Sequence, residues 1–259
     1  MIKLFVADLD GCISFPFQSP DWEAFSKIRE LNIQSKKEKG IPHLTICTGR
    51  PLPYVEAVAQ MLDVGLPFIF ESGGGLYDAK TNKLTWADAF NENTRKIIED
   101  LKHWLRKDII TNYEGTIPEF AKQTDVGLIN PDPAACKAMY DDIKDYVENR
   151  YDFFEIHYTD VSVNVILKDS NKGAGLLKLS ELTGFSLDEI AYIGDGTNDI
   201  PALKKAHMPF APLNARDETK NVATVIDDEA TRAVLKAYQR IVEHNKSFSR
   251  AMKDGEQLD

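Results

Sequence analysis

Hydrophobic residues along the chain alternate between short continuous runs and runs with helical spacing. Residues 2–7 form a nearly continuous apolar run, which is typical of a strand that is buried on both faces. Ser19 and Pro20 are typical of a helix start, and apolar residues follow at helical spacing over 22–31. Residues 43–47 then predict a second strand. This order of strand, helix and strand indicates an α/β fold with a parallel sheet.

The pattern changes between about residues 80 and 167. Two amphipathic stripes predict core-facing helices over 97–105 and 139–147, and Asp132 marks the start of the second helix. Residues 161–167 alternate valines with polar residues, as a strand with one buried face does. We therefore expect an α+β unit here rather than a continuation of the parallel sheet.

Alternation of strands and helices resumes after residue 167. Strands are predicted over 190–194 and near 208–211 and 224–226, and the polar tail after His244 is expected to fray. The predicted architecture is thus a Rossmann-like α/β core with a parallel sheet, interrupted by an inserted α+β domain. The core comprises 1–79 and 168–259, and the insertion comprises 80–167.

Composition excludes several kinds of partner. The 259 residues carry 31 Lys and Arg against 41 Asp and Glu, a net charge of −10, so we expect no nucleic-acid partner. No apolar run approaches the ~18 residues that a membrane span needs, so we expect no membrane association. Cys12, Cys47 and Cys136 have no CxxC spacing, which argues against a disulfide framework and a structural zinc site. We expect a reducing, cytoplasmic location.

Polar residues gather just after the predicted strands or at the start of the next helix. They are Asp8, Asp10, Thr48, Gly49, Arg50, Lys172, Asp195, Asn198 and Asp199. Ligands of open parallel sheets bind outside the carboxyl ends of the strands, so we expect these residues to converge. Two carboxylates ~4 Å apart repel by about 4 kcal/mol at an effective dielectric constant of ~20, so four aspartates at one site require a cation. An all-oxygen ligand set favours Mg²⁺.

Such a site is suited to phosphoryl transfer. Lys172 and the hydroxyl and backbone groups near Thr48 could hold phosphate oxygens, and Asp8 offers a carboxylate nucleophile. Arg50 has two open interpretations, which are phosphate binding and a simple ion pair. Gly73 to Gly75 lack the Gly-Lys-Ser/Thr ending of a P-loop, so we favour a turn or hinge there.

Four short segments, in this order and spacing, resemble the motifs of the haloacid dehalogenase superfamily. They are DLDG at 8–11, TGR at 48–50, Lys172 with Gly173, and GDGTND at 194–199. The insertion resembles the type-two α/β cap of subclass IIB. FESGGGLYD at 70–78 and TNYEG at 111–115 are similar to segments of archaeal-type phosphoglycolate phosphatases. The resemblance implies a cytosolic phosphatase that acts on sugar phosphates, phosphoglycolate or similar small esters.

The resemblance also implies a role for each motif residue. Asp8 would be the nucleophile, Asp10 the general acid and base with a backbone contact to the metal, and Lys172 the residue that stabilises nucleophile and phosphate. The implied metal set is Asp8, Asp10, Asp195 and Asp199, and the implied phosphate-binding set is Thr48, Gly49, Arg50 and Asn198. Two positions depart from the family pattern: Cys12 replaces the usual Thr, Val or Asn, and Ser72 replaces a common Asn.

Two other functions stay open at this point. A phosphomutase could use the same residues, because subclass IIB caps also occur there. A phospho-accepting signalling module is disfavoured, since it needs neither a leaving-group acid such as Asp10 nor a cap. The expected partner is a small phosphorylated metabolite, for which Glu114, Lys122 and Asn130 are candidate cap contacts, and the oligomeric state is left open. Cys12 is expected to be a buried hydrophobe rather than a redox thiol.

Overall fold

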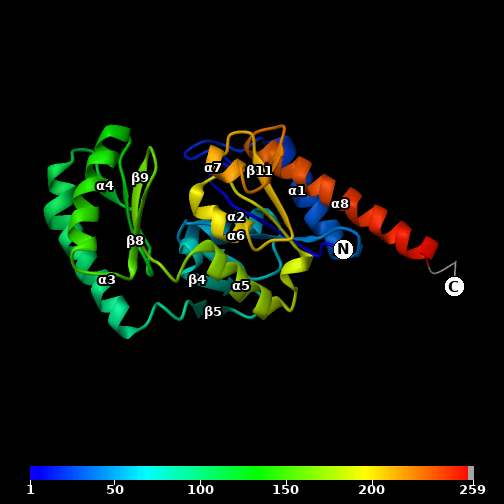
Figure 1. Cartoon of the computed structure of the whole chain (residues 1–259), viewed down its shortest axis with the longest axis horizontal. Helices are drawn as coiled ribbons and strands as arrows, with labels where there is room; N and C mark the ends of the chain where they lie inside the picture. Colours follow the sequence, from blue (N-terminus) through cyan, green and yellow to red (C-terminus); the bar gives the residue numbers. More distant parts are fainter. Residues whose placement is uncertain (256–259) are drawn as a thin grey trace.

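The core is built on a five-stranded parallel sheet. The structure, a computed structural model, describes residues 1–255, with side chains through Arg250. The strand order is β12-β11-β10-β1-β2. The strands are β1 (Leu4–Ala7), β2 (His43–Ile46), β10 (Ile190–Ile193), β11 (Met208–Pro212) and β12 (Thr224–Ile226). The predicted α/β class and parallel sheet are confirmed (Figure 1).

Helices cover both faces of this sheet. They are α1 (Trp22–Ser35), α2 (Leu52–Met61), α5 (Lys172–Thr183), α6 (Ile200–Leu203), α7 (Asp217–Lys220) and α8 (Ala230–Gly255). On β1, Phe5 and Ala7 pack in the apolar cluster formed with α1, α2 and α8, whereas Leu4 and Val6 pack in the cluster formed with α5 and α6. Because side chains alternate between faces and both faces are covered, the strand sequence is continuously apolar.

The ends of the core helices differ from the sequence prediction in two places. The cap of α1 is Asp21 rather than Ser19, because the Asp21 carboxylate accepts the backbone N–H groups of Glu23 and Ala24, each at 3.1 Å. The expected fraying after His244 is also wrong as far as Gly255, because α8 continues to that residue, and residues 256–259 lie outside the described part of the chain. Asn245 is fully buried and its side chain bonds to both backbone groups of Ile2, at 2.8 and 2.7 Å.

A small antiparallel sheet lies at the side of the core, with strands β3 (Phe68–Phe70), β4 (Gly75–Asp78) and β5 (Lys83–Trp86). Strand β3 pairs with β4 and contacts the main sheet through one bridge between Cys47 and Ile69. Strand β5 lies within the range 80–167 but pairs with β4 of the core. The exact domain boundary stays a prediction.

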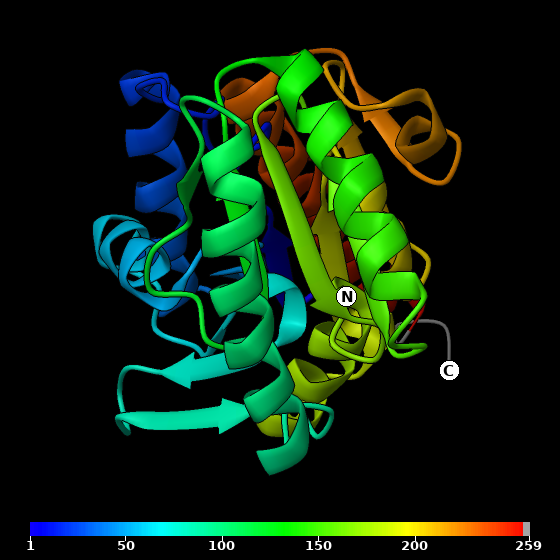
Figure 2. The ribbon, with the colours of Figure 1, turned by 90° about the vertical axis from the view of Figure 1, so that its left-hand side faces the viewer.

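The insertion has its own four-stranded antiparallel sheet, in the order β6-β7-β9-β8. Its elements are β6 (Ile117–Pro118), β7 (Val126–Ile129), β8 (Phe154–Tyr158), β9 (Ser162–Leu167), α3 (Glu92–Trp104) and α4 (Pro133–Glu148). The predicted stripe of α3 and its continuation is confirmed, with Ile98, Leu101 and Leu105 buried in a core separate from those of the parallel sheet. The two helices cover the outer face of the sheet, and the other face is turned toward the parallel sheet (Figure 2).

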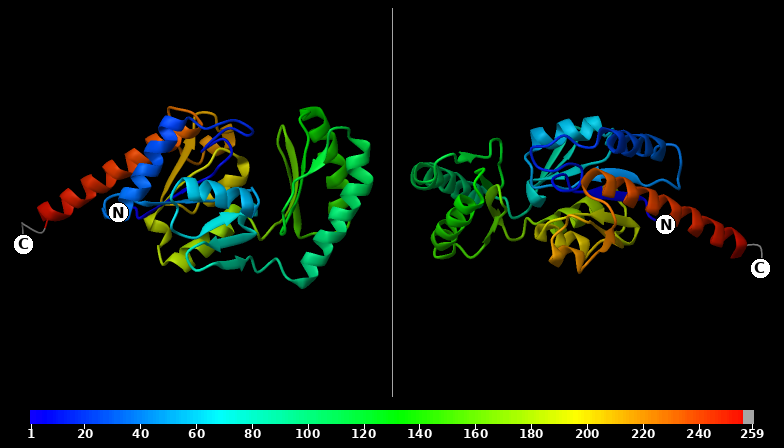
Figure 3. Two further views of the ribbon diagram at one scale, coloured as in Figure 1. Left: turned by 180° about the vertical axis from the view of Figure 1, so that it is seen from behind. Right: turned by 90° about the horizontal axis from the view of Figure 1, so that it is seen from above.

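Short helical turns complete the chain. They are Glu71–Gly73, Leu105–Ile109, Ile110–Asn112, Leu187–Glu189 and Thr197–Asp199. The insertion stands beside the core as a distinct body in the views from behind and from above (Figure 3). Within residues 1–255, no helix has the length and apolarity needed to cross a membrane.

Candidate active site

The predicted site residues meet at the carboxyl edge of the parallel sheet. Asp8 directly follows β1, Thr48 lies two residues past β2, and Asp195 lies two residues past β10. Lys172 is the first residue of α5, and Asp199 ends the turn that precedes α6. The fold thus brings these five side chains to the carboxyl edge of the parallel sheet, where the strand-end rule predicts a binding site.

Lys172 is a buried ammonium group held between two carboxylates. Its Nζ lies 2.8 Å from Oδ2 of Asp8 and 2.7 Å from Oδ1 of Asp199. Burial by itself would lower the pKa of Lys172, but the Asp199 and Asp8 carboxylates outweigh burial and raise that pKa well above its usual value. The side chain therefore stays charged next to Asp8.

Asp199 fixes the position of Lys172. Its Oδ1 accepts hydrogen bonds from Lys172 and from the Tyr192 hydroxyl, both at 2.7 Å, and its Oδ2 accepts the N–H of Gly196 at 3.0 Å. Sequence reasoning missed Tyr192, because a tyrosine within a buried strand reads as a core residue. Asp199 therefore orients the lysine, and its role as a metal ligand stays a prediction.

Three carboxylates offer a cation site, since Asp8, Asp195 and Asp199 each place an oxygen within 4.8 Å of the others. Burial raises the pKa of Asp8 well above its usual value, with Lys172 opposing and Asp199 and Asp195 adding to the rise. Burial and then Asp199 raise the pKa of Asp195 to about 7. Buried carboxylates that resist ionisation together are stabilised by a cation, and this oxygen-only donor set fits Mg²⁺.

The DLDG glycine is required by the geometry of this cation site. Gly11 has φ +75°, and a Cβ at this position would lie 2.0 Å from Oδ2 of Asp195. Only glycine lets the main chain after Asp10 approach the Asp195 carboxylate so closely. The predicted backbone contact between Asp10 and the metal stays a prediction.

Asp10 itself is engaged by Arg50. The Arg50 Nε and Nη2 donate to the two carboxylate oxygens of Asp10 at 2.7 and 2.8 Å, and this bonding raises the pKa of Arg50. Of the two interpretations of Arg50, the structure shows the ion pair, while phosphate binding stays a prediction. The Asp10 carboxylate is not part of the three-carboxylate cluster described above.

The loop that follows β2 is tied to the turn at Glu71–Gly73. The N–H of Thr48 donates to the carbonyl of Ile69, and the carbonyl of Thr48 accepts from the N–H of Ser72 at 2.9 Å. A Cβ on Gly49 would contact the Ser72 hydroxyl at 3.2 Å, and one on Gly73, which has φ +104°, would lie 2.3 Å from the Asn171 carbonyl. These close approaches favour a packed turn over a phosphate cradle for the glycine run.

A cleft of about 510 Å³ lies between the core and the insertion. It is lined by every predicted site residue except Asp199, which lies behind Lys172. Of the candidate cap contacts, Lys122 lines the cleft, whereas the Asn130 amide is occupied by the Glu114 carbonyl at 3.0 Å and by the Thr116 hydroxyl at 2.7 Å.

Several cleft residues were not predicted from the sequence. From the insertion they include Glu119, His157, Tyr158, Ser162 and Asn164, and from the core they include Phe17 and Arg216. The alternation in β9 was a usable signal, because Val163 and Val165 are buried while Ser162 and Asn164 face the cleft. No comparable signal marked Glu119, which lies in a loop.

Cys12 is buried beside the site with a free thiol. Burial, followed by the charges of Asp195 and Asp8, raises its pKa well above the usual value. Because the thiolate is the reactive form, a raised pKa disfavours reaction of this thiol, which agrees with the expectation of a small buried hydrophobe.

Comparison with known proteins agrees with this geometry. The sequence model of the haloacid dehalogenase-like hydrolases matches residues 5–118 and 106–237. The chain belongs to this family. A phosphoglycolate phosphatase from Methanopyrus kandleri is 28% identical over 230 residues, which cover 88% of this chain and 91% of the relative. A Bacillus subtilis protein named 5-amino-6-(5-phospho-D-ribitylamino)uracil phosphatase is 24% identical and covers 88% of this chain and 90% of its own length.

Solved structures show the same fold as this hydrolase. A haloacid dehalogenase-like hydrolase from Bacteroides thetaiotaomicron superposes with a TM-score of 0.72 at 17% identity, covering 93% of this chain and all of the other. A Thermoplasma acidophilum protein gives a TM-score of 0.70 at 23% identity, covering 93% of this chain and 98% of the other. The family resemblance found in the four motifs is therefore confirmed.

Proposed function

We propose that this hydrolase is a Mg²⁺-dependent phosphatase that cleaves a small phosphate monoester through an aspartyl-phosphate on Asp8. The observation that carries the proposal is the buried ion pair of Lys172 with Asp8, 2.8 Å long, next to an oxygen-only cation site. Phosphatase is also the activity named for the relatives from Methanopyrus kandleri and Bacillus subtilis.

In the first half of the proposed reaction, a carboxylate oxygen of Asp8 attacks phosphorus, and the bond between phosphorus and the ester oxygen breaks. Asp10 gives its proton to the departing alkoxide. Lys172 holds Asp8 in place and balances the charge of the phosphoryl oxygens, with Thr48, Gly49, Arg50 and Asn198 as the proposed phosphate contacts.

In the second half, Asp10 takes a proton from a water molecule, which attacks the phosphorus of the aspartyl-phosphate. The bond between phosphorus and the Asp8 oxygen breaks, so inorganic phosphate leaves and the carboxylate is restored. Mg²⁺, when held by Asp8 and Asp195, would neutralise negative charge that gathers on the phosphoryl oxygens. The insertion forms the opposite wall of the cleft and would limit the access of bulk water during the first half of the reaction.

We propose a sugar phosphate or a phosphoglycolate-like ester as the substrate, consumed in the cytoplasm. The cleft of about 510 Å³ has room for either. The test is a phosphate-release screen with Mg²⁺ across sugar phosphates, phosphoglycolate, nucleotides and polyol phosphates, with Asp8→Asn as the control. Selective release by the wild type alone would support the proposal, and no release from any ester would contradict it.

A further inference from the structure

A chain of charged side chains crosses the cleft from the core to the insertion. Arg50 pairs with both oxygens of Asp10, and its Nη1 lies 3.7 Å from Oε1 of Glu119. Oε2 of Glu119 lies 3.0 Å from Nζ of Lys122, which in turn lies 3.1 Å from Oδ2 of Asp125. The proposed general acid is thereby connected to a buried lysine of the insertion through Arg50 and Glu119.

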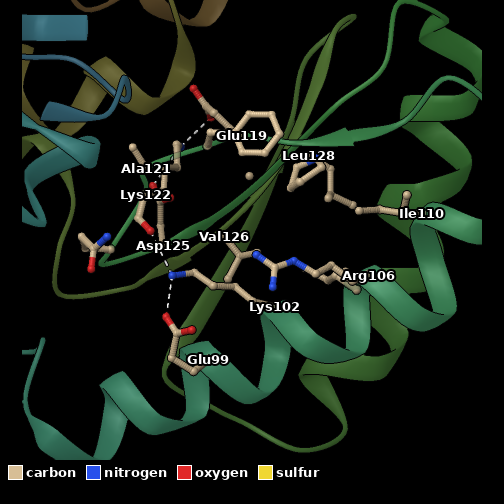
Figure 4. A pocket seen from close by; sticks show the side chains of 15 residues that line it. Glu99, Lys102, Arg106, Ile110, Glu119, Ala121, Lys122, Asp125, Val126 and Leu128 are labelled. Atoms are coloured by element: carbon tan, nitrogen blue, oxygen red, sulfur yellow. Dashed lines mark hydrogen bonds and ion pairs between the residues drawn. The ribbon is translucent and has the colours of Figure 1, made fainter. Parts of the chain in front are cut away.

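The loop that carries Glu119, residues 119–125, is fastened to the core by Glu71. The Glu71 carboxylate is buried and accepts the N–H groups of Gln123 and Thr124 and the Thr124 hydroxyl, at 2.6 to 3.0 Å. Glu71 has φ +48°, and its own N–H donates to the Arg50 carbonyl at 3.0 Å. Figure 4 shows Glu119, Lys122 and Asp125 on this loop, seen beside a second cavity of about 370 Å³.

This arrangement prevents the Asp10 carboxyl group from acting as the general acid. A general acid needs one oxygen that carries a proton toward the leaving group, but both Asp10 oxygens accept bonds from Arg50. Within the described residues, the ion pairs of Arg50 are with Asp10 and Glu119. The guanidinium also lies over the rings of Tyr54 and Phe17, at 5.2 and 5.7 Å from their centres, so it can exchange partners without leaving the cleft.

We propose that Glu119 is a positioning residue that draws Arg50 off Asp10 when substrate phosphate enters the cleft. The inference rests on the proposed function. Five fixed N–H donors let Arg50 bond to Glu119 and to a phosphate oxygen at the same time, and Asp10 then turns an oxygen to the leaving group. Glu119 acts only through Arg50.

The test compares two esters with different needs for an acid. Departure of an alkoxide requires a proton, whereas 4-nitrophenolate leaves without one. In Glu119→Gln, we expect the single-turnover rate constant for cleavage of an alkyl ester selected in the screen to fall about 10- to 100-fold, a part of the ~10²–10⁴-fold that general acid catalysis supplies. We expect the burst rate constant for 4-nitrophenolate release, which reports the first half-reaction alone, to stay within about twofold of wild type.

Asp125→Asn is the matched control. Either substitution takes one negative charge from Lys122 and leaves it one carboxylate, but only Glu119 pairs with Arg50. Burial raises the pKa of Asp125 to about 7, so the assays are run at pH 8, where its charge is largely present. We expect Asp125→Asn to leave the ratio of alkyl to aryl rates unchanged.

The outcomes separate this inference from the proposed function. A wild type that hydrolyses neither ester would overturn both. Equal slowing of the two esters by Glu119→Gln, no slowing at all, or the same change of ratio in Asp125→Asn would overturn the role of Glu119 alone. If Glu119→Gln folds poorly, Glu119→Asp replaces it in the test. The Asp side chain keeps a negative charge beside Lys122, but its carboxylate lies one methylene farther from Arg50. We expect this variant to lower the ratio of alkyl to aryl rates by a smaller factor, and an unchanged ratio would overturn the inference.

Discussion

At the scale of single residues, the site is organised by charges that burial makes costly unless they are paired. Lys172 is charged because Asp8 and Asp199 outweigh its burial, whereas burial and then the Asp199 carboxylate raise the pKa of Asp195. The same aspartates that provide chemistry therefore reduce the stability of the protein without metal. This loss of stability can be measured as a change in melting temperature.

Asp195→Asn should raise the melting temperature of the protein in a chelator at pH 8. The carboxyl pKa rises from 3.8 to about 7 on folding, so wild type loses stability as pH rises from about 4 to 7, where the unfolded chain has released the proton and the folded chain has not. The advantage of the variant should shrink as pH is lowered toward 4. Thermal unfolding at several pH values measures it.

The same variant tests the cation site. Mg²⁺ should raise the melting temperature of wild type and leave that of Asp195→Asn nearly unchanged, because a bound ligand stabilises the folded state by mass action. Phosphatase turnover of the variant should be lost. An equal response of both proteins to Mg²⁺, or full activity of wild type after chelation, would contradict this assignment.

The two aspartates of the DLDG segment should differ in their kinetic effects. Asp8→Asn should be inactive on every ester, because an amide cannot form the phosphoenzyme. Asp10→Asn should release one nitrophenolate per enzyme from 4-nitrophenyl phosphate and then stall, since the intermediate lacks a base to activate water. Rapid-quench kinetics and the intact mass of the acid-quenched protein measure this. Equal slowing of alkyl and aryl esters without a burst would assign Asp10 a structural role.

Sequence reasoning located the motif residues because each follows a strand or begins a helix, but it missed residues defined by contacts across the chain. Tyr192 holds Asp199 from within an apolar strand, and Glu71 binds a loop 52 residues away. Glu119 meets Arg50 only because two domains face each other. Local propensity and periodicity carry no information about such pairs, so the structure was needed to find them.

At the scale of elements, apolar periodicity predicted the strands of the parallel sheet and the main helices but missed the strands β4, β5, β6 and β7. It also misplaced two helix ends. The cap of α1 is Asp21, whose carboxylate also meets Arg232 of α8 at 2.7 Å. The polar tail stays helical because Asn245 is buried against the start of β1. The cap itself is local, whereas the docking of the tail depends on residues 243 positions apart, which a local pattern does not contain.

Asn245→Ala should therefore destabilise the whole core, although it lies in a polar segment. The substitution removes hydrogen bonds to the N–H and carbonyl of Ile2 and to the carbonyl of Gly40. Leaving a buried backbone group unsatisfied costs about 1–3 kcal/mol, so we expect a loss of at least this size in the free energy of unfolding. Chemical denaturation measures it, with exposed Lys246→Ala as the control. Equal, small effects would show that the end of α8 is not docked.

At the scale of the whole molecule, the apolar cores of the parallel sheet and of the insertion are built from separate sets of residues. The proposed nucleophile, its lysine and the cation site all lie in the core, whereas the opposite wall of the cleft belongs to the insertion. This division predicts that chemistry and substrate choice reside in different bodies, which an experiment can separate.

Replacing residues 88–168 by a short Gly-Ser linker should leave a folded core, because β5 stays paired with β4 and no core strand is removed. This core should still hydrolyse 4-nitrophenyl phosphate with Mg²⁺, since an aryl ester needs little acid catalysis. It should lose discrimination among natural esters, because the cleft wall that contacts the leaving group is gone. Rates across the ester panel, with circular dichroism as the folding control, measure both effects. A truncated protein that unfolds, or one that keeps its substrate preference, would show that the insertion does not act as a separate specificity domain.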